Sequence, residues 1–299
     1  MADSYTPVPL RPIQSIQALF ARRDLTPCEK LECLKFYLTA YGHRSLFATL
    51  PRSGLNYTQL MVEVAWDIAQ GGTGEYYYRN NKFFLVANVR LARTALDYRT
   101  PISLRRGFDF HPLQKPVIYS THDPYDRIQN LQRSQMHVVV LVRNMFQQLE
   151  SWLFHSGYAV ETQADFIRDG FVDRSIHFYN SWGHFLERHP NSQLLKYEDL
   201  RGHPEQALRL LSRSWNLHFP EPAIEAAVAK CTKQEMLKVI NQQQRGQNPR
   251  VSDRDAQLAV FTVETLKRIQ EQIHQHLKYS FGYDYSTLPT VPRLGGEAL

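Results

Sequence analysis

The sequence has 299 residues, of which 43% are hydrophobic, a length and apolar content that suit one large α/β domain with a substantial core. Its 35 basic and 29 acidic residues give a net charge of +6 without any Lys/Arg block, so an anionic ligand is favoured and nucleic acid is not required. The three cysteines are too few and scattered for a disulfide scaffold or a zinc site, and we expect a cytoplasmic protein with no signal peptide and no membrane partner.

Short apolar segments rich in β-formers alternate with stretches of helical periodicity, a pattern typical of a parallel sheet covered by helices. The predicted strands are residues 46–50, 116–120, 137–142 and 193–197. The predicted helices are residues 14–22, 28–41, 57–69, 144–155, 162–167, 174–188, 204–216, 221–230 and 255–277. We expect a single α/β domain over residues 13–285, an extended N-terminal arm at 1–12 and a loose C-terminal tail at 286–299.

An anion-binding turn is predicted where the first strand ends, in 46-LFATLPRSGLNYTQL-60. Backbone N–H groups at the start of the following helix would point at one place, and Arg52 and Ser53 would add a charge and a hydroxyl there. The expected ligand is a phosphate or a sulfate. The Walker pattern G-x-x-x-x-G-K-S/T does not occur near residue 50, which disfavours an ordinary P-loop kinase.

Residues 71–111 interrupt the alternation of strands and helices, and we interpret them as an excursion from the sheet that forms a substrate lid. Aromatic side chains in and near this region either line an acceptor pocket or pack the lid: Tyr76, Tyr77, Tyr78, Phe83, Phe84 and Tyr125. An anionic or polymeric acceptor is the alternative, because the same region carries Arg90, Arg93, Arg99, Arg105 and Arg106.

Two further strands end in residues suited to a reaction site. His122 follows the second predicted strand, Arg143 follows the third, and Ser151 comes eight residues later on a predicted helix. Because ligands of open α/β sheets collect at the carboxyl ends of the strands, we expect His122 and Arg143 to meet the turn at 51–54. Imidazole has a pKa of about 6.5, which suits His122 for proton transfer near neutral pH.

These segments follow one another along the chain in the same order as the motifs of the sulfotransferases that use 3′-phosphoadenosine 5′-phosphosulfate (PAPS), and they resemble that family over roughly residues 46–285. The family motifs are P-K/R-S-G-T-T-W, K-T-H-L-P, R-x7-S and a strand followed by Y-E-D-L, and the matching segments begin at Pro51, Ser120, Arg143 and Tyr197. The resemblance implies a P-loop-like three-layer α/β fold. It also implies transfer of a sulfonate group from PAPS to a hydroxyl or amine of a small-molecule acceptor, with release of 3′-phosphoadenosine 5′-phosphate (PAP).

The resemblance implies a role for each matching residue. His122 is the general base, and Arg52 stabilises the leaving phosphate. Arg143 and Ser151 would bind the 3′-phosphate. The full set expected to bind the nucleotide is Arg52, Ser53, Gly54, Leu55, Asn56, Tyr57, Arg143, Ser151, Thr232, Lys233, Arg245 and Gly246.

Several of these assignments have alternatives. Tyr57 stands where relatives carry a Trp that stacks on adenine, and it either stacks or packs beneath its helix. Thr232 and Lys233 lie in a segment resembling T-S-F-x-x-M, which is otherwise a helix cap and helix. Arg245, in the nearest match to the R-K-G loop, competes with Arg250 for the 3′-phosphate.

The sequence also departs from the family pattern. Ser120 occupies the place of a Lys near the sulfonate, so charge stabilisation there must fall more heavily on Arg52 and backbone donors or on another basic residue. Glu198 and Asp199 are interpreted as architecture, with a catalytic carboxylate as the alternative. A non-catalytic nucleotide-binding scaffold and a kinase remain as alternative functions. No metal is expected, and nothing in the sequence indicates the oligomeric state.

Overall fold

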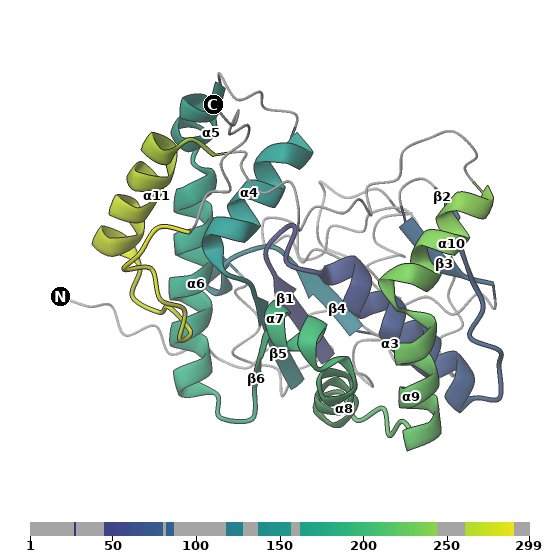
Figure 1. Cartoon of the computed structure of the whole chain (residues 1–299). Helices are drawn as coiled ribbons and strands as arrows, with labels where there is room; N and C mark the ends of the chain where they lie inside the picture. The colour runs from purple at the N-terminus through teal and green to yellow at the C-terminus, as the bar shows by residue number, and fades with distance from the viewer. Residues whose placement is uncertain are drawn as a thin grey trace.

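The computed structural model describes residue 27 and residues 45–79, 82–86, 118–127, 137–156, 162–243 and 261–289. These residues form a parallel sheet with helices on both faces (Figure 1). The predicted α/β fold class is therefore confirmed. The predicted helices at 14–22 and 28–41 and the predicted arm at 1–12 lie outside the described residues.

The four predicted strands all form, and they make one sheet in the order β4-β1-β5-β6. They are β1 (Ser45–Thr49), β4 (Ile118–Thr121), β5 (His137–Val142) and β6 (Gln193–Lys196), and every pairing is parallel. The chain places β4 on one side of β1 and then β5 on the other. Ligands of open α/β sheets bind where the strand order reverses in this way, so β1 ends at the expected site.

The central strands are apolar throughout because both faces of the sheet are buried. Successive side chains of β1 alternate between two core clusters, with Leu46 and Ala48 on one face and Phe47 on the other. In the same way, Val138 and Val140 of β5 share the first cluster while Val139 belongs to the second.

Each face of the sheet has its own layer of helices (Figure 1). The first layer contains α4 (Met145–Ser156), α5 (Gln163–Arg168), α6 (Phe171–Arg188) and α11 (Val263–His276). The second contains α3 (Leu55–Ala69), α7 (Tyr197–Gly202), α8 (Pro204–Ser214), α9 (Glu221–Lys230) and α10 (Lys233–Gln243). Within the described ranges, no helix is both long and apolar enough to cross a membrane.

The expected excursion begins as a hairpin outside the main sheet. Strands β2 (Tyr76–Arg79) and β3 (Lys82–Leu85) pair antiparallel with each other. Tyr78, Phe83 and Leu85 are buried in the cluster that also contains the α3 side chains. Burial therefore favours the packing alternative for Tyr78 and Phe83. Residues 87–117 lie outside the described part of the chain.

Several boundaries differ from the predicted ones by a few residues, and two of these differences have a clear physical reason. Residue 197 was predicted as strand, but β6 ends at Lys196, and the Y-E-D-L segment forms the short helix α7, which ends before Pro204 starts α8. The last helix was predicted over residues 255–277, of which 255–260 lie outside the described residues. In the described part, α11 begins at Val263 behind Thr262, whose side chain accepts from Thr265 N at 3.1 Å. Of the predicted tail, residues 286–289 are described, and Leu288 packs against the core.

Candidate functional site

The carboxyl ends of β1, β4 and β5 meet at one edge of the sheet (Figure 1). Ala48 pairs with Thr121 of β4, and Thr49 pairs with Leu141 of β5. The three segments predicted to carry chemistry therefore begin side by side: the turn at 51–54, His122 and Arg143. This arrangement is the one that the sequence predicted from the order of its strands.

The turn at 51–54 is tight and strained. Ser53 N donates to Leu50 O at 3.3 Å, and Arg52 has a positive φ of 70°. With Pro51 at the second position, this is the pattern of a type II turn, whose third position normally holds glycine. A left-handed non-glycine residue costs about 1–3 kcal/mol and persists where surrounding contacts impose it, often at functional sites. Here Gln148 of α4 supplies such a contact, since its Nε2 donates to Pro51 O at 2.9 Å.

Gly54 connects the turn to α3. Its φ is 105°, and a Cβ at this position would lie 2.7 Å from Cδ2 of Tyr197. Gly54 gives α3 no side-chain cap, so the first N–H groups of the helix have no cap acceptor. The buried Ser53 Oγ beside them has no hydrogen-bond partner among the described residues. Together these donors suit an anion at the N-terminus of α3.

Two arginine side chains lie at this turn: Arg52, which belongs to it, and Arg143, which follows β5. Arg52 Nε donates to Ser151 Oγ at 3.2 Å, and Arg143 Nη1 donates to Arg52 O at 3.0 Å. The Arg143 guanidinium also lies over the Tyr197 ring, 4.4 Å from its centroid, and its buried Nε has no partner within the described part of the structure. The structure thus brings together the predicted set of Arg52, Arg143 and Ser151, in which Arg143 Nε is a donor without a partner among the described residues.

His122 lies one strand away from the turn, directly after β4. Its Nδ1 is 2.5 Å from Thr49 O, and because a carbonyl oxygen only accepts, Nδ1 carries a proton. In the neutral imidazole Nε2 is then the acceptor. The side chain is exposed at the end of β4.

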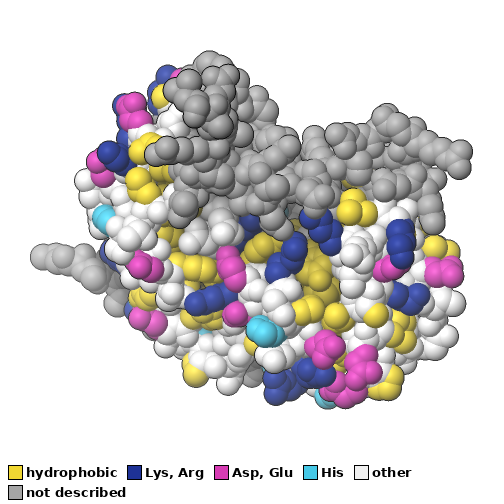
Figure 2. Space-filling view, viewed as in Figure 1, with side chains coloured by type: hydrophobic (Ala, Val, Ile, Leu, Met, Phe, Trp, Pro, Cys, Tyr) yellow, Lys and Arg dark blue, Asp and Glu magenta, His cyan; other side chains and the backbone are white. Residues whose placement is uncertain are grey.

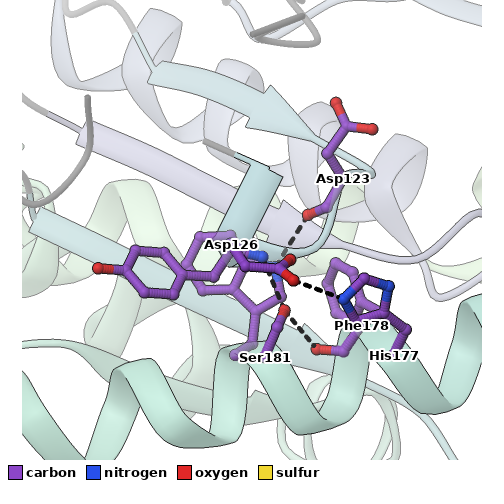
Figure 3. Close-up of polar contacts among 7 residues, drawn as sticks. Asp123, Asp126, His177, Phe178 and Ser181 are labelled. Carbon is purple, nitrogen blue, oxygen red and sulfur yellow. Dashed lines mark hydrogen bonds and ion pairs between the residues drawn. The ribbon is translucent and has the colours of Figure 1, made fainter. Parts of the chain in front are cut away.

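Contacts with α6 support the segment that carries His122 (Figure 3). Trp182 Nε1 donates to Asp123 O at 3.0 Å, and Ser181 Oγ accepts from Tyr125 N at 2.7 Å. The pair between His177 Nε2 and Asp126 Oδ2, at 2.7 Å, adds a third link at the short helix η1 (Tyr125–Arg127). Sequence reasoning missed this support, although a buried Trp usually finds a partner for its indole N–H.

Tyr125 itself belongs to the core. It is buried with ring centroids 4.6 Å from Phe185 and 5.6 Å from Trp182. This packing favours the lid or core alternative over an acceptor pocket for Tyr125. The backbone of Phe84 lies in β3, and its side chain is outside the described set.

Tyr57 lies half-buried beside the segment that precedes α10. Burial, with the neighbouring Cys231 as the next cause, raises the pKa of Tyr57 to about 12. Cys231 is fully buried, and its pKa is raised above the usual range by burial. The hydroxyl of Tyr76 donates to Lys230 O at 2.5 Å, which ties the hairpin to the same segment. The structure therefore places Tyr57, Tyr76 and the segment around Cys231 together.

The other residues predicted to bind the nucleotide lie at the starts of α3 and α10 or outside the described residues. Thr232 Oγ1 accepts from Glu235 N at 3.3 Å, as the helix-cap alternative expects, and Lys233 is the first residue of α10. Asn56 is exposed and Leu55 half-buried at the start of α3. Arg245, Gly246 and the rival Arg250 lie outside the described residues. Figure 2 shows Lys and Arg side chains among hydrophobic ones in the middle of this face, between α4 and α10.

The two carboxylates of the Y-E-D-L segment behave differently. Glu198 Oε1 accepts from Asn144 N at 3.1 Å and its other oxygen from the Tyr283 hydroxyl, whereas Asp199 is exposed. These contacts favour the architectural interpretation of Glu198.

No cluster of His, Cys, Asp or Glu suited to a metal ion occurs in the residues that the structure covers.

Comparisons with known proteins agree with this architecture. The family model for the sulfotransferase domain matches residues 43–281. The crystal structure of mouse sulfotransferase SULT7A1 complexed with PAP is similar, with 13% identity and a TM-score of 0.53 over 80% of this chain and 85% of that one. Retinol dehydratase in complex with androsterone and inactive cofactor PAP has 16% identity and a TM-score of 0.50 over 78% and 80% of the two chains. At these identities the two structures show a shared fold. No curated protein sequence matches the chain.

Proposed function

Because the chain belongs to the sulfotransferase family, we propose that it transfers a sulfonate group from PAPS to a hydroxyl or amine of a small-molecule acceptor and releases PAP. The observation that carries the proposal is the set of donors at the ends of β1 and β5. Ser53 Oγ and Arg143 Nε are buried without partners among the described residues, and the N-terminus of α3 has no side-chain cap. Each buried unsatisfied group costs about 1–3 kcal/mol, which a bound anion would recover.

We assign the 5′-phosphosulfate to the turn at 51–54 and the first turn of α3. The 3′-phosphate would meet Arg143 and Ser151, which reach the same place from β5 and α4. The adenine would lie near Tyr57, beside the segment around Cys231. The PAP complex of SULT7A1, a protein with the same fold, supports this choice of nucleotide.

We assign the general base to His122. The acceptor oxygen or nitrogen would attack sulfur in line with the leaving phosphate while His122 Nε2 takes its proton. The hydrogen bond from Nδ1 to Thr49 O supports this role, since it fixes the tautomer and turns Nε2 into the acceptor. Arg52 and the backbone donors of the turn would neutralise charge that develops on the bridging oxygen. They would also serve in place of the family Lys, because Ser120 stands at that position.

Of the acceptor candidates whose side chains the structure describes, Tyr77 is the one that is half-buried and not bonded to Lys230. The acceptor would approach on the exposed side of His122. We propose a small metabolite as acceptor rather than a macromolecule.

Transfer from radiolabelled PAPS to a panel of phenols, alcohols and amines, with and without a chelator, tests the proposal. We expect label to move to at least one acceptor at a rate that the chelator leaves unchanged. Binding of PAPS without transfer to any acceptor would favour the scaffold alternative, for which Ser120 is the supporting observation. Metal-dependent turnover of ATP would favour a kinase.

A further inference from the structure

Three consecutive backbone N–H groups at the turn between β5 and α4 are bonded to side chains from distant parts of the chain. Arg143 N donates to Tyr179 Oη at 3.2 Å, Asn144 N to Glu198 Oε1 at 3.1 Å and Met145 N to Tyr285 Oη at 3.2 Å. The N-terminus of a helix is ordinarily a ready anion site. Here side-chain oxygens from α6, α7 and the segment after α11 accept from these three N–H groups. The N-terminus of α4 therefore does not offer them to an anion, whereas the N-terminus of α3 has no side-chain cap.

Two of these side chains, Tyr179 and Glu198, each make a second hydrogen bond that strengthens the contacts on this turn. The hydroxyl of Tyr179 also donates to Arg143 O, so one buried side chain bonds both backbone groups of Arg143. The second oxygen of Glu198 accepts from the hydroxyl of Tyr283, which ties the C-terminal segment to the same carboxylate. Burial raises the pKa of both tyrosines above the usual range, so they remain protonated donors.

The guanidinium of Arg143 is fixed as well. It donates to Arg52 O and stacks on the ring of Tyr197, the residue before Glu198. Both the backbone and the guanidinium of Arg143 are thus held in place before a ligand binds. Preorganisation of this kind raises affinity because less freedom is lost on binding.

We propose that Glu198 and Tyr179 are positioning residues that fix the backbone of Arg143 and thereby aim its guanidinium at the 3′-phosphate. By accepting from the N–H groups of Arg143 and Asn144, they withhold these donors from the phosphate, which would then meet the Arg143 guanidinium and Ser151. The inference rests on the proposed function, and it assigns Glu198 a role other than that of a catalytic carboxylate.

Paired substitutions of Glu198 test the inference by titration of PAP and by steady-state kinetics. Glu198→Leu removes both acceptors and is expected to weaken PAP binding about tenfold or more. Glu198→Gln is expected to stay within about threefold, because its Oε1 still accepts from Asn144 N and its amide can donate to Tyr283 Oη. Glu187, which accepts from Tyr279 Oη at 2.5 Å on the exposed surface, is the matched control, and Glu187→Leu should leave PAP affinity unchanged.

A double-mutant cycle separates positioning from general destabilisation. In an Arg143→Ala background, Glu198→Leu is expected to change PAP affinity less than about twofold, since the residue that it positions is gone. An equal loss in both backgrounds would overturn the inference. If Glu198→Leu does not fold, the same cycle with Tyr283→Phe decides, because that change removes one hydroxyl and keeps the ring.

Failure of the inference can be told from failure of the proposed function. If Arg143→Ala weakens PAP binding and neither Glu198→Leu nor Tyr283→Phe does, the positioning role alone is wrong. If Arg143→Ala has no effect, the proposed phosphate site is wrong and the inference falls with it. Loss of turnover in Glu198→Gln at unchanged PAP affinity would identify a catalytic carboxylate and overturn the inference.

Discussion

Replacement of Gly54 by alanine should weaken the nucleotide site as well as destabilise the fold. Gly54 has a φ of 105°, and an added Cβ would lie 2.7 Å from Cδ2 and 2.9 Å from Cε2 of Tyr197. A left-handed conformation costs an L-residue about 1–2 kcal/mol. The Tyr197 ring must also move, and overpacking of this kind typically costs about 1–3 kcal/mol.

The displaced ring matters because the guanidinium of Arg143 lies over it. Loss of a cation–π contact is worth about 0.5–2 kcal/mol. At about 1.4 kcal/mol for each factor of ten, the Kd for PAP should rise roughly 2- to 30-fold.

Gly170 provides the matched control. Its φ is 77°, it precedes α6 as Gly54 precedes α3, and nothing lies within 4 Å of an added Cβ. Gly170→Ala should therefore show the backbone cost alone in thermal unfolding and leave the titration of PAP unchanged. Equal effects of the two substitutions on PAP affinity would refute the argument from Tyr197.

Three further outcomes are expected. His122→Ala should abolish transfer and leave the Kd for PAP within a few-fold, because the imidazole serves the acceptor; near-normal turnover would exclude His122 as the base. Tyr57→Ala should weaken PAP binding by about 1–3 kcal/mol while Tyr57→Phe retains it, since the ring alone stacks; equal losses would exclude stacking. The free energy of unfolding should fall as the pH rises from 10 toward 12, because Tyr57 ionises near 10 when unfolded and at about 12 when folded, and a denaturant titration of Tyr57→Phe should show a smaller alkaline loss.

The centre of the fold could be predicted because its signals are local. The run 137-HVVVLV-142 is apolar at every position after the first, as a strand buried on both faces requires, and it forms β5. The sequence also places His122 and Arg143 directly after strands, and parallel pairing then brings their segments to one edge.

The residues that support the site could not be predicted, because their partners are far away in the sequence. Gln148 and Pro51 are 97 positions apart, and Glu198 and Asn144 are 54 apart. Tyr179 is an ordinary core residue by its helical spacing, and only the folded chain shows its hydroxyl on the backbone of Arg143. Gln148 alone left a signal, as a polar residue on a helix face shared with Met145 and Leu149.

A comparison of PAP with AMP, which lacks the 3′-phosphate, tests the central claim most directly. Titration calorimetry on the wild-type chain should show PAP binding at least about tenfold more tightly, since a charge-assisted contact contributes about 1.5–3 kcal/mol. In Arg143→Ala this preference should largely disappear. Equal affinities for PAP and AMP in the wild-type chain would contradict the assignment of a 3′-phosphate site at Arg143 and Ser151, and with it the use of PAPS as donor.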